Sequence, residues 1–119
     1  MPWWEAEQRG MTIALGSDIG AGRSFSMRRA MASAYDNALC LGRPVTLEQL
    51  LAWATLGGAR ALGLGSWIGS LEKGKEADVV VVPMSGRAQS QAEVLAELVF
   101  DCDDVQVEAC YVRGRSLLD

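Results

Sequence analysis

The chain has 119 residues, a net charge of −4 and an isoelectric point near 4.8, and half of its residues are hydrophobic. This length and composition suffice for one modest domain with a buried core, and the acidic balance argues against a nucleic-acid partner. No apolar run reaches the roughly 18 residues that cross a bilayer, and the acidic N-terminus does not resemble a signal peptide.

The complete absence of histidine is the most restrictive feature of the composition. It removes the commonest general base, the commonest metal ligand, and every Ser-His-Asp or Cys-His site within this chain. Three cysteines, Cys40, Cys102 and Cys110, show no CxxC spacing. We therefore expect reduced thiols in a cytosolic protein.

The first 41 residues predict a helix end, a strand and a longer helix. Gly10 follows a short helical stretch, at the place of a C-terminal capping glycine. The apolar run 11–15 predicts a buried strand. Residues 24–41 carry an apolar stripe at three- and four-residue spacing, which predicts a helix that Ser24 or Ser26 can cap.

Gly42 is expected to end this helix. The clearest local signal follows it, where the sequence predicts the start of another helix. Thr46 and Gln49 are spaced as a capping box, in which each side chain bonds the other residue's backbone N–H. Val45 and Leu50 flank this pair as a hydrophobic staple, which fixes the angle at which the chain enters the helix.

The pattern then changes from helices to strands. Gly57 and Gly58 are expected to interrupt the helix before a second short helix at 59–62. Strands are predicted at 67–71 and 77–82, joined by a Lys-Gly-Lys turn.

The last third of the chain predicts a polar loop, a short helical or extended piece at 93–100, and a hairpin at 105–118 with its turn at Arg113-Gly114. The chain is thus helical in its first half and β-rich in its second. Such a division suggests pieces of two layers rather than one wound domain.

Asp18 lies where the predicted strand 11–15 ends and a loop containing Gly20 and Gly22 begins. A carboxylate in this position resembles the rim of a parallel α/β barrel, where active sites are built. The alternative is an aspartate that caps the loop with its own side chain. Nucleotide binding is not indicated, because Phe25 occupies the last small-residue position of the dinucleotide fingerprint and no P-loop lysine follows.

The other candidate residues have structural interpretations. The Cys102-Asp103-Asp104 stretch has no second ligand group nearby, so we interpret it as a solvated acidic turn rather than half of a metal site. Arg28 and Arg29 lie off the apolar stripe and predict a solvated helix face. The tryptophans are expected to be core or interface anchors: Trp3, Trp4, Trp53 and Trp67.

Three segments, "ALGSDIGAGRSFSM", "TLEQLLAWATLGGARALGL" and "IGSLEKGKEADVVVV", occur in an order and spacing that resemble the C-terminal third of the metal-dependent amidohydrolases. Within that superfamily they are most similar to the guanine deaminase branch, and the resemblance covers nearly the whole chain. It implies an α/β fold. Residues 1–66 would form the last strand and helices of a (β/α)8 barrel, and residues 67–119 a β-rich segment of the associated small β-sandwich.

The resemblance also implies chemistry for Asp18. In such enzymes the aspartate at the end of the eighth strand binds the catalytic zinc and moves protons during hydrolysis of guanine to xanthine and ammonia. Gly20 and Gly22 are neighbouring candidates for contact with the purine. The family's histidine ligands lie upstream of this segment, and this chain has none. We therefore expect it to be inactive alone and to bind no zinc tightly.

Several interpretations remain open at this point. The chain is expected to be a truncated gene product, a late-starting reading frame or one part of a split enzyme. It can equally be a non-catalytic remnant that self-associates, or a small purine-binding module that keeps a pocket near Asp18. The expected partners are a second copy of the chain or a missing N-terminal barrel part, with no membrane involved.

Overall fold

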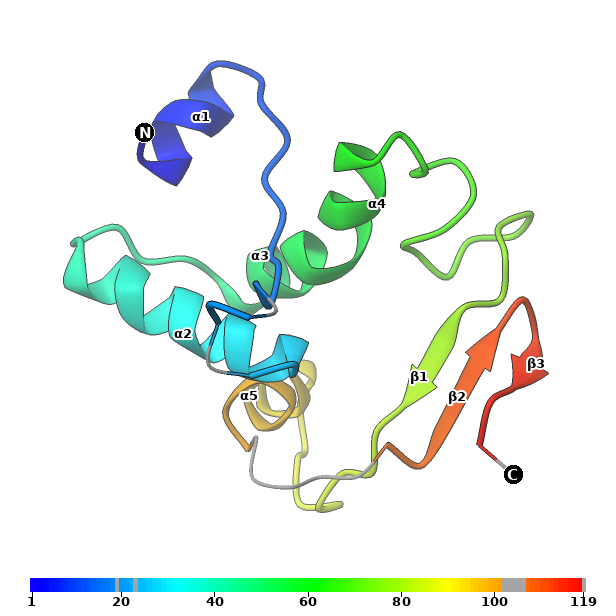
Figure 1. The fold of residues 1–119 in the computed structure, drawn as a ribbon. Coiled ribbons are helices and arrows are strands. Elements are labelled where there is room, and N and C mark those ends of the chain that lie inside the picture. Colours follow the sequence, from blue (N-terminus) through cyan, green and yellow to red (C-terminus); the bar gives the residue numbers. More distant parts are fainter. Residues whose placement is uncertain (19, 23, 102–106, 119) are drawn as a thin grey trace.

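Helices occupy the first half of the chain, and a small sheet lies beside them (Figure 1). The structure, a computed structural model, describes residues 1–18, 20–22, 24–101 and 107–118. Its helices are α1 (Trp3–Gln8), α2 (Met27–Cys40), α3 (Leu47–Ala52), the π-helix η1 (Trp53–Gly57), α4 (Gly58–Ala61) and α5 (Gln91–Phe100). Its strands are β1 (Val79–Val81), β2 (Ala109–Val112) and β3 (Arg115–Ser116). None of the helices described is long and apolar enough to cross a membrane.

The ends of the first two helices agree with the sequence prediction. Gly10 follows the end of α1 with a φ of 72°, a left-handed conformation that glycine adopts at little cost. Ser26 caps α2, because its hydroxyl oxygen accepts a hydrogen bond from the Arg29 N–H at 3.4 Å. Gly42 then ends α2 with a φ of 64°.

The capping box at the start of α3 is also confirmed. Thr46 Oγ1 accepts from the Gln49 N–H at 3.2 Å, and Gln49 Oε1 accepts from the Thr46 N–H at 2.9 Å. Both residues of the predicted staple, Val45 and Leu50, are buried. Local side-chain chemistry therefore fixes where this helix begins.

We expect Thr46→Ala to lower the free energy of unfolding by about 1 kcal/mol, because it leaves the Gln49 N–H without its acceptor. Urea titration followed by circular dichroism measures the change. Thr46→Ser keeps the hydroxyl and is the matched control. Equal stability of the alanine and serine variants would contradict a role for this cap.

The expected break at the two glycines does not occur. Residues Trp53–Gly57 continue α3 as a π-helix, and α4 follows without interruption. Gly57 is helical, with a φ of −59°. A Cβ atom placed on it would lie 2.4 Å from the carbonyl oxygen of Ile13. The missing side chain of Gly57 lets the segment that contains Ile13 approach this helix closely. Gly57 is therefore a packing position within the helix and not its end.

Residues 11–15 do not form the predicted buried strand. They run as an irregular segment between α1 and α2 (Figure 1). Met11 in this segment is 52% exposed. The Leu15 N–H donates to the Trp53 carbonyl at 3.1 Å, which ties the segment to the helix η1 instead. A strand requires a neighbour with which to share a ladder, and no described strand pairs with this segment.

The strand predicted at 67–71 is also wrong. These residues form turns and bends, and Gly69 has a φ of 92°. A Cβ atom on Gly69 would lie 2.6 Å from Cβ of Ala59, so the loop packs directly on α4. Tight packing against a helix replaces sheet pairing here. The Lys-Gly-Lys turn is confirmed, and Gly74 adopts a φ of 97°.

The sheet consists of three antiparallel strands in the order β1-β2-β3. Val79 lies opposite Tyr111, which confirms the central part of the strand predicted at 77–82. The predicted turn at Arg113-Gly114 is confirmed, with positive φ values of 51° and 74°. Asp78 Oδ1 accepts from the Arg113 N–H at 2.8 Å, which explains how a non-glycine residue holds this conformation.

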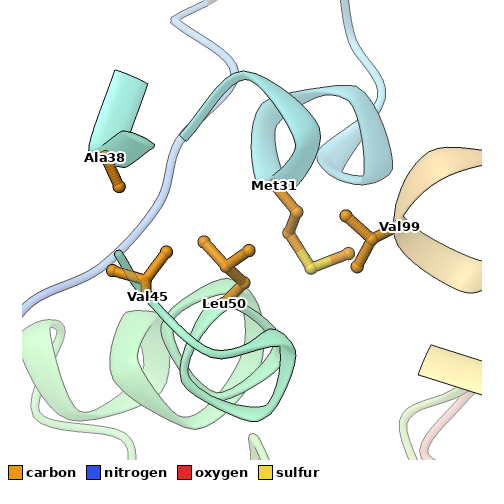
Figure 2. Close-up of a cluster of buried hydrophobic side chains, with 5 residues drawn as sticks. All are labelled: Met31, Ala38, Val45, Leu50 and Val99. Carbon is orange, nitrogen blue, oxygen red and sulfur yellow. The ribbon is translucent and has the colours of Figure 1, made fainter. Parts of the chain in front are cut away.

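The core lies among α2, α3 and α5 (Figure 2). It contains five buried side chains: Met31, Ala38, Val45, Leu50 and Val99. Leu50 and Val99 are fully buried. The segment 93–100, expected to be helical or extended, is part of the helix α5, which Ser90 caps. The helix α5 belongs to the second half of the sequence, and it packs on α2 and α3 from the first half.

Two of the four tryptophans, Trp3 and Trp53, pack against the core, as predicted. The Trp3 ring packs edge-on against Trp53 at 5.1 Å and against Trp4 at 5.7 Å. The Arg43 guanidinium lies over the Trp4 ring at 5.3 Å, a cation–π contact. Trp67 differs, since it is 62% exposed and is therefore no core anchor.

Candidate functional site

Hydrogen bonds order the loop that carries Asp18 before and after the aspartate. On its N-terminal side the Leu15 N–H bonds the Trp53 carbonyl at 3.1 Å. On its C-terminal side the Ser26 N–H donates to Ser24 Oγ at 3.0 Å, directly before α2 begins. The Asp18 carbonyl accepts from the Gly22 N–H at 2.5 Å, which closes a tight turn.

The backbone of this turn requires particular residues. Asp18 has a φ of 50°, in the left-handed region that aspartate tolerates better than most residues. A Cβ atom on Gly22 would lie 1.9 Å from the Ser17 carbonyl oxygen, so only glycine fits. Gly20 has a φ of 102°, which also favours glycine. The glycines that the sequence marked are thus structural requirements of the turn.

A cavity of about 590 Å³ lies beside Asp18. Its walls come from the end of the 11–15 segment, the Asp18 turn, one face of α2, and Phe100 at the end of α5. Of the residues predicted from sequence, Asp18 and Gly22 line this cavity and Gly20 does not. The volume lies within the range of small-molecule sites, roughly 300–1,000 Å³. We call this cavity the Asp18 pocket.

Sequence reasoning missed two walls of the Asp18 pocket. The α2 wall carries polar side chains at helical spacing, among them Arg29, Ser33 and Asn37. That spacing is visible in the sequence and could have indicated a polar face. Phe100 lies 82 positions after Asp18, and no local pattern connects the two residues. Only the packing of α5 on α2 brings them to one cavity.

In the part of the chain that the structure describes, Asp18 has no partner ligands for a zinc ion. A catalytic zinc takes three protein ligands, and Asp18 supplies one carboxylate. Across residues 1–18, 20–22, 24–101 and 107–118, no group of three His, Cys, Asp or Glu side chains could hold a metal ion. Cys40 and Cys110 are free thiols. The predicted acidic turn at Cys102-Asp103-Asp104 lies outside the described residues.

Comparison with known sequences finds guanine deaminases that are similar to nearly the whole chain. The chain is 33% identical over 120 residues to the guanine deaminase of Escherichia coli (strain K12), covering 93% of this chain and 27% of that protein. It is 33% identical over 125 residues to the guanine deaminase of Mus musculus, covering 89% of this chain and 27% of the relative. The chain thus spans about a quarter of the length of these relatives.

Solved structures show the same likeness. E. coli guanine deaminase superimposes with a TM-score of 0.91 at 31% identity, covering 99% of this chain and 29% of that one. A zinc-bound adenosine deaminase from Xanthomonas campestris gives a TM-score of 0.78 at 29% identity, covering 94% and 27%. The profile of the amidohydrolase family matches residues 1–117. This chain therefore belongs to the amidohydrolase family.

Proposed function

We propose that this chain forms part of a guanine deaminase-like aminohydrolase, which converts guanine and water to xanthine and ammonia. The observation that carries the proposal is the likeness to E. coli guanine deaminase, a TM-score of 0.91 over 99% of the chain. The Asp18 pocket supports it, because a carboxylate lies beside a cavity large enough for a purine.

In this proposal Asp18 moves protons. Its carboxylate takes a proton from the attacking water and delivers it to the departing ammonia, as one group can do when both lie within hydrogen-bond reach. The turn holds Asp18 in one backbone conformation, which favours a defined position for its side chain. The described residues place no group of three ligands around Asp18, so they do not hold zinc by themselves, and further ligands would have to join Asp18.

We further propose which part of the enzyme's fold each segment of the chain forms. Residues 1–66 would contribute the last strand and helices of a (β/α)8 barrel, and residues 67–119 would contribute strands of the associated sandwich. The three-stranded sheet within the second segment supports this division. Pairing of residues 11–15 as a barrel strand would then depend on neighbouring strands supplied from outside the chain.

A purine-binding module without catalysis is the second candidate. The observation that favours it is the Asp18 pocket itself, which the described residues of this chain line without help. Isothermal titration of the chain with guanine and xanthine separates the two candidates. Binding by the isolated chain supports the module, whereas turnover that appears only with added polypeptide supports the enzyme.

The isolated chain should release no ammonia from guanine above the buffer rate and should bind zinc weakly, because its described residues contain no group of three metal ligands and the sequence has no histidine. A chimera tests the positive side of the proposal. In it, this chain replaces the segment that it matches in E. coli guanine deaminase. The chimera should produce xanthine. Turnover by the zinc-loaded, purified chain alone would contradict the expectation.

We expect the isolated chain to self-associate. It exposes 8532 Å² of surface, whereas a compact monomer of its mass exposes about 6,300 Å². Exposed apolar side chains such as Leu71, Trp67 and Phe25 contribute to the excess. Burying such area between two copies is the simplest way to remove it from water. Light scattering at micromolar concentration measures the mass, and a monodisperse 12.8 kDa species would contradict the expectation.

A further inference from the structure

Arg28 connects the first turn of α2 to the last turn of α5. Its Nε donates to the Leu98 carbonyl at 2.6 Å, and its Nη2 donates to the Glu97 carbonyl at 3.2 Å and to the Asp101 carbonyl. The side chain is therefore not on the solvated helix face that the sequence predicted. The carbonyls of the last helical turn have few partners within the helix, and the planar fork of a guanidinium suits them well. Of the three acceptors, the Glu97 carbonyl also accepts from the Asp101 N–H at 3.0 Å.

This contact holds the helix end that carries Phe100. Phe100 lines the Asp18 pocket, and its ring meets the Tyr35 ring edge-on at 5.0 Å. Ser85 also contacts α5: its backbone N–H and hydroxyl donate to the Glu97 carboxylate and keep the pKa of that group below its usual range. The position of Phe100 therefore depends on contacts far away in the sequence.

Arg28 and the pocket share the same helix. Arg29 and Ala30, its neighbours on α2, line the Asp18 pocket, as do residues one and two turns further along. Phe100 faces this wall from α5. Any change in the separation of α2 and the end of α5 changes the width of the cavity. The hydrogen bonds of the Arg28 side chain span these two helices.

We propose that Arg28 is a positioning residue for the Asp18 pocket: it holds the end of α5, and with it Phe100, against α2, and so sets the width available to a flat ring. The proposed function supplies the identity of that ring, a purine. An aromatic wall such as Phe100 suits a planar heteroaromatic ligand, because flat faces bury large area without needing directed polar partners.

The first test asks whether Arg28 holds the wall, and it needs no activity. The chain contains two tyrosines and two phenylalanines, so nuclear Overhauser contacts between the Tyr35 and Phe100 rings can be assigned. In Arg28→Ala these contacts should weaken, and amides at 97–101 should exchange with solvent roughly tenfold faster as the helix end frays. Arg115→Ala removes the same charge from β3 and should change neither. An unchanged ring contact in Arg28→Ala would overturn the proposal.

The second test uses the chimera and asks what the wall does. Arg28→Ala should raise the KM for guanine about tenfold or more, with kcat changed less and the pH profile of kcat unchanged. Arg28→Lys keeps the charge but not the planar guanidinium fork. Its KM should therefore lie between the KM of the parent chimera and that of Arg28→Ala. If Arg28→Ala lowers both kcat and the free energy of unfolding but leaves KM unchanged, the role of Arg28 is purely structural and the proposal is overturned. An inactive parent chimera would count against the proposed function. The Overhauser contacts between Tyr35 and Phe100 would still show whether Arg28 positions the wall.

Discussion

Asp18→Asn in the chimera should lower kcat for guanine by roughly 10²- to 10⁴-fold, the usual worth of a general acid–base group. Asparagine keeps the shape of the side chain and tolerates the left-handed φ of 50° at this position. It cannot accept and return a proton at neutral pH, so the proton transfers lose their carrier. Steady-state assays of ammonia release, with xanthine measured by absorbance, give the change.

The matched control is Asp78→Asn, at the residue directly before β1. Its side-chain oxygen can still accept from the Arg113 N–H, so the turn keeps its hydrogen bond. This variant should retain kcat within a factor of about two, since exposed polar changes away from a site have small effects. A folded Asp18→Asn chimera with more than a tenth of the parent kcat would show that Asp18 does not move the protons.

Leu50→Ala should lower the free energy of unfolding by roughly 2–5 kcal/mol, the largest stability effect that we expect. Leu50 has no exposed surface and lies at the centre of the cluster formed by α2, α3 and α5 (Figure 2). Truncation removes its apolar contacts and leaves a cavity that closely packed neighbours cannot fill. Only eight described apolar residues are buried, so little else compensates.

Leu71→Ala makes the same chemical change at a residue that is 85% exposed, and it should shift stability by less than about 0.5 kcal/mol. Urea titrations of both variants and the parent, at one protein concentration, separate the two effects from any change in association. Equal losses in Leu50→Ala and Leu71→Ala would contradict the core described here.

Sequence reasoning succeeded where the determinants are local. Ser26 and Thr46 bond backbone groups three residues away, so their roles can be seen in a short stretch of sequence. Gly42 ends α2 by its own conformational freedom. Asp18 and Gly22 were found for the same reason, since the turn that they share spans five residues.

Sequence reasoning failed where the determinants lie far apart along the chain. Gly57 looked like a break, but its role depends on Ile13, which approaches the helix from 44 residues earlier. Arg28 looked solvated because its acceptors follow 69 to 73 residues later. The strand expected at 11–15 assumed neighbouring strands that the described chain does not place beside it.

The central claim is that this chain provides a working part of a guanine deaminase-like enzyme. The most direct measurement is the rate of xanthine formation from guanine by the purified, zinc-loaded chimera, beside the isolated chain and the E. coli enzyme. We predict that the chimera turns over guanine, that its Asp18→Asn variant loses roughly 10²-fold or more of kcat, and that the isolated chain shows none. A folded chimera that binds zinc but forms no xanthine would contradict the claim.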